Sequence, residues 1–190
     1  MNNGKKALLI IDMQNDFVKE GAPIEVKGIR KNITAFKEFI DFCRDKGLLI
    51  VYTRHCYSPN TNPIEAKLFS HIRKPYLQKG SRGWQICDDL KPEKSDVLID
   101  KTRYDAFFKT KLHILLRKNN IQELIITGTM TEICCESTAR SAMYHDYDLI
   151  FCDDLTYTSD PTRHKRTLQI IESHFGKVMK KNEIKKIIKN

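Results

Sequence analysis

The feature that most constrains the fold is the apolar run at residues 7–11, ALLII, which ends at Asp12. A run with no polar face suits a central strand of a parallel sheet that is covered on both sides. Similar short runs recur along the chain, and helix-like spacing of apolar residues separates several of them. They lie at residues 48–52, 97–100, 124–126 and 149–152, with a candidate edge strand at 177–179.

This alternation predicts an α/β fold with three layers, α/β/α, in which helices cover both faces of a six-stranded, mostly parallel sheet. At 190 residues the chain suits a single domain, residues 1–190. Residues 54–84 break the pattern with proline, glycine and polar residues, so we expect a long functional loop there. The lysine-rich end of the chain alternates with isoleucine, which predicts a terminal amphipathic helix.

Three reactive side chains fall at the ends of predicted strands: Asp12, Lys101 and Cys134. The carboxyl ends of parallel strands share one edge of the sheet, where ligands bind in such folds. A carboxylate can take the proton of a thiol, and a lysine can hold both anionic forms. We expect Thr131 to cap the next helix, whose amide dipoles would favour a Cys134 thiolate.

Each residue also has a purely structural interpretation. Asp12 can be a solvated strand end or a helix cap, and Lys101 can be a surface charge. Cys134 can be a small buried hydrophobic residue, which is the commonest state of a free cysteine. The joint placement of the three favours a nucleophilic site.

Three motifs around these residues resemble those of the isochorismatase-like cysteine hydrolases. Residues 10–17 (IIDMQNDF) resemble the family's aspartate motif, residues 101–108 (KTRYDAFF) its lysine motif, and residues 127–134 (TGTMTEIC) its nucleophile motif. The resemblance runs in order from about residue 5 to residue 180. It implies that Asp12, Lys101 and Cys134, not Cys135, form the catalytic triad.

The resemblance further implies hydrolysis of a C–N bond in a small amide or ureido molecule through a Cys134 thioester. Backbone amides would hold the oxyanion, supplied by Cys134 and by a cis peptide between Thr129 and Met130. Substrate contacts are expected from residues in the loops at the same edge of the sheet. These are Phe17, Arg54, His55, Trp84 and Tyr104.

Asp105 departs from the family pattern, since a small Ser or Asn is frequent at this position. Its negative charge can repel acidic substrates, or it can pair with Lys101 or Lys109, and we favour the pairing.

No metal or other cofactor is expected. The nicotinamidases of this family carry an Asp-x-His pattern after the second strand. The equivalent residues 53–57 of this chain read TRHCY and do not keep this pattern. A zinc site from His55, Cys56 and His71 has no supporting ligand spacing. We therefore expect nicotinamide to be a poor substrate.

The net charge of +9 is spread along the chain without a recognition motif, so we expect a small-molecule substrate and no nucleic-acid partner. The six dispersed cysteines and the lack of a signal-peptide pattern favour the cytoplasm, and no apolar run is long enough to span a membrane. The family implies a homo-oligomer, a dimer or tetramer.

Two other functions stay open. An isochorismatase-type enol-ether hydrolase would use the Asp and Lys without a cysteine nucleophile, so the presence of Cys134 argues against it. A noncatalytic protein would use its basic surface and tail to bind nucleic acid or another partner.

Overall fold

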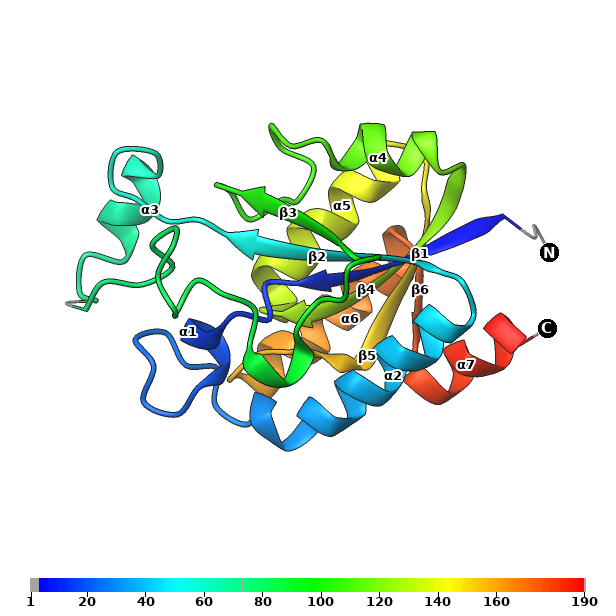
Figure 1. The fold of residues 1–190 in the computed structure, drawn as a ribbon, viewed down its shortest axis with the longest axis horizontal. Helices are drawn as coiled ribbons and strands as arrows, with labels where there is room; N and C mark the ends of the chain where they lie inside the picture. Colours follow the sequence, from blue (N-terminus) through cyan, green and yellow to red (C-terminus); the bar gives the residue numbers. More distant parts are fainter. Residues whose placement is uncertain (1–3, 73, 190) are drawn as a thin grey trace.

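A computed structural model describes residues 4–72 and 74–189, and its centre is a six-stranded sheet (Figure 1). The strand order is β3-β2-β1-β4-β5-β6, and all neighbouring strands pair in parallel. The strands are β1 (Lys5–Ile11), β2 (Leu49–His55), β3 (Val97–Lys101), β4 (Ile121–Thr129), β5 (Asp148–Tyr157) and β6 (Lys177–Met179). The predicted α/β fold with a parallel sheet is confirmed.

Helices cover both faces of the sheet, which makes the predicted three layers (Figure 1). They are α1 (Asn15–Val18), α2 (Ile33–Asp45), α3 (Pro63–Leu68), α4 (Leu112–Lys118), α5 (Glu136–Tyr144), α6 (Pro161–His174) and α7 (Lys181–Lys189). Shorter turns are η1 (Ile29–Asn32) and η2 (Asp88–Leu90), which are 3-10 helical, and η3 (Thr131–Cys135), which is π-helical.

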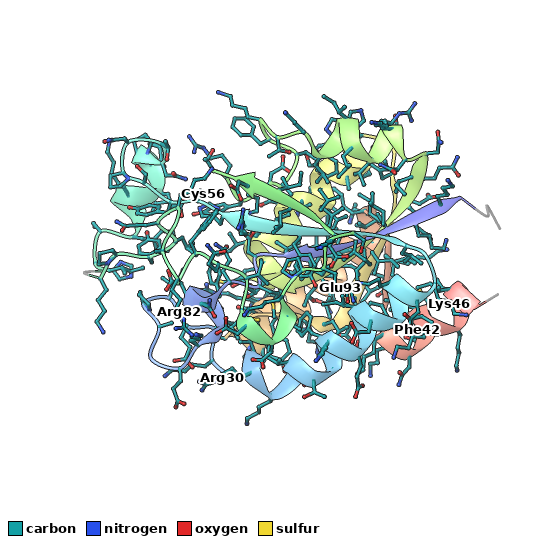
Figure 2. All side chains as sticks on the ribbon, in the orientation of Figure 1. Arg30, Phe42, Lys46, Cys56, Arg82 and Glu93 are labelled. Atoms are coloured by element: carbon teal, nitrogen blue, oxygen red, sulfur yellow. The ribbon has the colours of Figure 1, made fainter. Side chains whose placement is uncertain are left out.

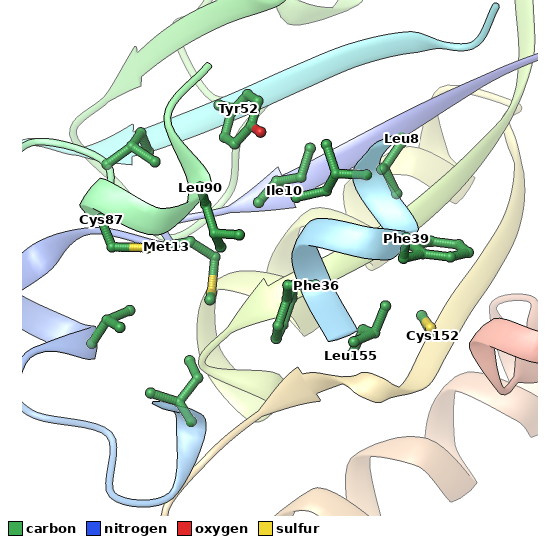
Figure 3. Packing of buried hydrophobic residues seen from close by; sticks show 14 of the residues in the cluster. Leu8, Ile10, Met13, Phe36, Phe39, Tyr52, Cys87, Leu90, Cys152 and Leu155 are labelled. Atoms are coloured by element: carbon green, nitrogen blue, oxygen red, sulfur yellow. The ribbon is translucent and has the colours of Figure 1, made fainter. Parts of the chain in front are cut away.

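The sheet separates two apolar clusters, and β1 contributes to both because successive side chains of a strand point to opposite faces. Leu8 and Ile10 pack with Phe36 and Phe39 of α2, as Figure 3 shows. Ala7, Leu9 and Ile11 pack on the other face, together with buried residues of α4, α5 and α6. The continuous apolar run of β1 therefore reflects burial on both sides.

The predicted terminal helix is present as α7. Its Ile184 is fully buried in the cluster that contains α2, whereas Lys186 is exposed. Among residues 4–72 and 74–189, no helix combines the length and apolar character needed to span a bilayer.

The long excursion after β2 contains α3 and lies beyond the carboxyl end of the sheet (Figure 1). Figure 2 places Cys56 at this end and Lys46 at the opposite end of the molecule. The same end carries the last residues of β1, β3 and β4. The candidate functional residues therefore lie at one edge of the sheet.

Candidate active site

Asp12 follows β1 directly and has a left-handed backbone, with φ of 50°. Aspartate tolerates this region better than most residues, and such conformations are concentrated at functional sites. The side chain is fully buried. Its Oδ1 accepts a hydrogen bond of 2.6 Å from the hydroxyl of Thr53, and the Thr53 oxygen accepts one of 3.1 Å from the Asp12 amide. Thr53 thereby holds the carboxylate in place.

Lys101 is the last residue of β3, and its side chain is as buried as that of Asp12. The Nζ atom lies 2.6 Å from Asp12 Oδ2 and donates a hydrogen bond of 3.1 Å to the carbonyl of Arg103. A buried ammonium needs such partners, because an unpaired charge in the interior is very costly. Lys101 is therefore a buried charge and not a surface charge.

Cys134 lies in η3, directly after β4, and is 5% exposed. Its Sγ, one carboxylate oxygen of Asp12 and one ring nitrogen of His55 all lie within 4.8 Å of one another. The structure thus brings Asp12, Lys101 and Cys134 together. Cys135, which comes next, is fully buried among apolar residues on the α5 side of the sheet.

The charges of these groups depend on burial. Burial, the largest effect, raises the pKa of the Cys134 thiol above its usual value, and the Lys101 ammonium only partly opposes it. For Lys101, burial lowers the pKa, but the charges of Asp12 and Cys134 outweigh it and raise the pKa above the usual value. Burial thus favours the neutral thiol of Cys134, against the expected thiolate.

The turn from β4 into α5 also differs from the expected helix cap. The hydroxyl of Thr131 caps no amide; it lies 3.0 Å from Nδ1 of His164, whose Nε2 lies 3.1 Å from Oδ1 of Asp153. The carboxylate accepts from Nε2, and in the tautomer that holds this one proton Nδ1 accepts from the Thr131 hydroxyl. This partly buried contact anchors the first residue of the turn that carries Cys134.

Just before this turn, the peptide bond between Thr129 and Met130 is cis. The Met130 carbonyl accepts hydrogen bonds from the amides of Ile133 and Cys135, at 3.1 and 3.2 Å. Gly128 has φ of 117°, and a Cβ there would lie 2.1 Å from the carbonyl oxygen of Ile11. Only glycine lets β4 approach β1 this closely beside Asp12.

A cavity of about 90 Å³ opens beside Cys134. Three of the residues expected to contact substrate line it: Phe17, His55 and Tyr104. Burial, the largest effect, raises the pKa of Tyr104 to about 12, so its hydroxyl stays protonated near neutral pH.

Arg54 and Trp84, the other two expected substrate contacts, lie outside this cavity. Strand alternation explains the difference, because Thr53 and His55 face the site and Arg54 therefore faces away. Its guanidinium pairs with Asp100 at 2.8 Å and lies 3.7 Å from the centre of the Trp84 ring. The indole N–H of Trp84 donates a hydrogen bond to Sγ of Cys56, which does not line the cavity. The structure therefore does not bring Arg54 and Trp84 into the cavity with Phe17, His55 and Tyr104.

Asp105 pairs with neither Lys101 nor Lys109, contrary to expectation. Its two carboxylate oxygens accept hydrogen bonds from the amide of Phe107, at 2.8 Å, and from the hydroxyl of Ser141, at 2.9 Å. The carboxylate therefore connects the loop after β3 to α5.

The sequence did not single out two further residues of the site, Glu65 and Gln14. Glu65, from α3, lines the cavity and accepts a hydrogen bond of 3.1 Å from His55. The buried Gln14 amide accepts from the His55 amide at 2.8 Å and donates to the His55 carbonyl at 3.0 Å. A glutamine in the strand-end motif was the only available signal, since nothing in the sequence places α3 over the cavity.

Among residues 4–72 and 74–189, Asp12, His55 and Cys134 form the one cluster of potential metal ligands. The residues do not fit a cation. The Lys101 ammonium already neutralises Asp12, and His55 uses one ring nitrogen to contact Glu65. A second positive charge beside Lys101 would be repelled.

A more open depression of about 600 Å³ lies at the amino ends of the strands, lined by residues such as Lys5, Arg44 and Ile187. Its lining includes no cysteine or histidine, and it lies at the opposite end of the sheet from Cys134. The small cavity is therefore the candidate active site.

Comparison with known proteins identifies the family. The isochorismatase domain family model matches residues 6–183. A ureidoacrylate amidohydrolase, RutB, from Enterobacter sp. (strain 638) is 32% identical over 192 residues, covering 90% of this chain and 83% of that protein. The RutB of Agrobacterium fabrum is 30% identical, covering 93% and 87%.

Solved structures agree with this fold. A cysteine hydrolase from Pseudomonas syringae pv. phaseolicola superposes with a TM-score of 0.90 at 23% identity, covering 97% of this chain and 92% of that one. An isochorismatase-like hydrolase from Alkaliphilus metalliredigens gives a TM-score of 0.86 at 27% identity, covering 96% and 98%. The chain therefore belongs to the isochorismatase family.

Proposed function

We propose that this protein hydrolyses a C–N bond of a small amide or ureide, with Cys134 as nucleophile, Asp12 as acid and base, and Lys101 as the charge that holds Asp12. The observation that carries the proposal is the buried Cys134 thiol within 4.8 Å of the Asp12 carboxylate, at the edge of a cavity. The relatives named ureidoacrylate amidohydrolase support the choice of a C–N bond.

In the first half of the reaction, the Asp12 carboxylate takes the proton of the Cys134 thiol as the sulfur attacks the carbonyl carbon. The S–C bond forms, and the carbonyl electron pair moves onto oxygen. When this oxyanion collapses, the C–N bond breaks and the nitrogen takes the proton from Asp12. Ammonia or an amine leaves, and the acyl group stays on Cys134 as a thioester.

The neutral thiol suits this sequence of steps. Because burial keeps the pKa of Cys134 high, the proton leaves as the S–C bond forms and negative charge moves onto the substrate oxygen. Lys101 stays charged throughout, since its own pKa is raised above the usual value. The Lys101 ammonium balances the negative charge of the Asp12 carboxylate, which is restored at the end of each half-reaction.

Backbone amides of Met130 and Cys134, in the turn after Thr129, are the proposed donors to the oxyanion. Removing one such donor typically costs about 3 to 4 kcal/mol of transition-state stabilisation. Phe17, His55 and Tyr104 would hold the substrate against this turn.

In the second half, water attacks the thioester carbonyl and gives its proton to Asp12. The C–S bond then breaks, the sulfur recovers the proton from Asp12, and a carboxylic acid leaves; a ureide yields carbamic acid in its place. The thiol and the carboxylate return to their starting states, so no cofactor is consumed.

Ammonia release from a panel of small amides, ureides and nicotinamide tests this function. Turnover by the wild-type protein that is lost in Asp12→Asn and Cys134→Ala, but kept in Cys135→Ala, is expected. Ammonia release by a folded Asp12→Asn variant at the wild-type rate would contradict the assigned base. We expect nicotinamide to be a poor substrate, because the site does not fit a metal.

We also propose that the protein works in the cytoplasm as a homo-oligomer. Its six cysteines are free, which suits a reducing compartment. Large apolar side chains on α4 and α5 are exposed, with Ile114 at 68% and Tyr144 at 70%, and a subunit contact would cover them. Light scattering after size exclusion tests the oligomer, and a monomer at micromolar concentration would contradict it.

A further inference from the structure

The cavity beside Cys134 has apolar walls and one charged group. Its walls include Ile24, Phe69, Ile72, Leu77 and Ile133. The charged group is the carboxylate of Glu65, whose side chain is 11% exposed. Within the described part of the chain, the lining includes no lysine or arginine. Among the described lining residues, a ligand that enters therefore meets mostly apolar side chains, the polar groups of His55, Tyr76, Tyr104 and Cys134, and one carboxylate.

The Glu65 carboxylate is held by a histidine ring and a side-chain amide. Its oxygens lie 3.1 and 3.2 Å from Nε2 of His55, and Oε2 accepts a hydrogen bond of 3.0 Å from the Asn62 amide. Among residues 4–72 and 74–189, no lysine or arginine forms an ion pair with it. With little water around it, this charge acts strongly on any second carboxylate in the cavity.

The same contact determines what His55 offers to a ligand. A carboxylate only accepts hydrogen bonds, so Nε2 carries a proton; in the tautomer that holds this one proton, Nδ1 is an acceptor. Nδ1 is buried, and none of the described residues forms a hydrogen bond with it. A buried acceptor without a partner is costly, and the N–H of an amide or ureide beside Cys134 would satisfy it.

We propose that the substrate is a neutral amide or ureide with an apolar group and at least one N–H, and that Glu65 excludes carboxylate-bearing analogues. The inference rests on the proposed function and adds the substrate class to it. His55 is a substrate-binding residue that accepts from the N–H. Glu65 acts by charge on the ligand and by fixing the proton on His55 Nε2.

Two matched pairs of compounds test this class. 3-Methylbutanamide and malonamate differ by an isopropyl group in place of a carboxylate, as do isobutylurea and N-carbamoylglycine. We expect kcat/KM for each neutral member to exceed that of its acidic partner by about 100-fold, since placing like charges together costs several kcal/mol. Equal or faster cleavage of the acidic members would overturn the substrate class while leaving the proposed hydrolysis intact.

The variant Glu65→Gln removes the charge but keeps an acceptor for His55 and Asn62. We expect it to reduce the preference for neutral compounds by about tenfold, through a rise in kcat/KM for the acidic members. The matched control is Glu172→Gln on the exposed surface of α6, which should leave the preference unchanged. An unchanged preference in a folded Glu65→Gln protein would overturn the role of Glu65.

The N,N-dimethyl amide of 3-methylbutanoic acid lacks the N–H and tests His55. We expect no measurable cleavage of it, and cleavage at the rate of the primary amide would overturn the assigned hydrogen bond. If no compound of either class releases ammonia or amine, the proposed function fails, and the substrate class fails with it. The wild-type comparison of the two pairs stands even if a variant does not fold.

Discussion

The ion pair between Lys101 and Asp12 makes a strong prediction about stability as well as activity. Nζ lies 2.6 Å from Oδ2, and both side chains are fully buried. The change Lys101→Met keeps most of the side-chain volume and removes the ammonium. It leaves the Asp12 carboxylate in the interior without a cationic partner, next to the hydroxyl of Thr53 at 2.6 Å and the thiol of Cys134.

The size of the effect follows from this geometry. Removing one partner of a buried pair costs about 3 to 5 kcal/mol, and the remaining Thr53 contact favours the lower end of that range. For a domain of this size, about 3 kcal/mol corresponds to a fall in Tm of roughly 6 to 12 °C. Exposed Lys186→Met, on α7, is the matched control and should change the free energy of unfolding by less than about 0.5 kcal/mol.

Urea unfolding of wild type, Lys101→Met, Asp12→Asn and the double variant gives the coupling between the two charges. The double variant should be more stable than Lys101→Met, because neither charge is left alone. In Lys101→Met, the carboxyl avoids its unpaired charge by binding a proton, so the destabilisation should shrink as the pH falls from about 8 to about 5. Strict additivity, or a loss below about 1 kcal/mol in Lys101→Met, would refute the buried ion pair.

Three further predictions test the surroundings of the site. Gln14→Ala removes the bonds to the His55 backbone and should cost about 1 to 3 kcal/mol of unfolding free energy while raising KM, and an unchanged KM would contradict this role. Burial, the largest effect, raises the pKa of Cys43 from 9.0 to about 12. The contribution of the buried Cys43 thiol to the free energy of unfolding is therefore complete below pH 9 and is lost as the pH rises toward 12. Over this range the free energy of unfolding of Cys43→Ala should fall with pH less steeply than that of wild type, by up to about 1.4 kcal/mol per pH unit. Equal slopes of unfolding free energy against pH, measured by urea unfolding, would refute this prediction. His164→Ala leaves the Thr131 hydroxyl without its partner and should lower kcat about tenfold at nearly constant KM, whereas a change in KM alone would show that the contact does not position the turn.

Much of the fold could be predicted because its signals are local. The apolar run of β1 continues because the strand is buried on both faces, and the carboxyl ends of parallel strands necessarily share an edge. The placement of Asp12, Lys101 and Cys134 near one another follows from that topology. Their catalytic roles are still a prediction.

The features that the sequence did not predict depend on tertiary structure. The pKa of the Cys134 thiol is raised mainly by burial, which the strand and helix pattern does not reveal. The direction of Arg54 follows from which residues of β2 face Asp12, and the apolar pattern does not show this. Glu65 lies in a polar loop region with no periodicity, and only the folded chain brings it to His55.

The central claim is a covalent acyl intermediate on Cys134. Acid-quenching the protein during turnover of 3-methylbutanamide, followed by peptide mass spectrometry, measures it directly. We expect an acyl group on Cys134 and none on Cys135, with no adduct in Cys134→Ala. Steady ammonia release by folded Cys134→Ala, or an acyl group on any other residue, would contradict it.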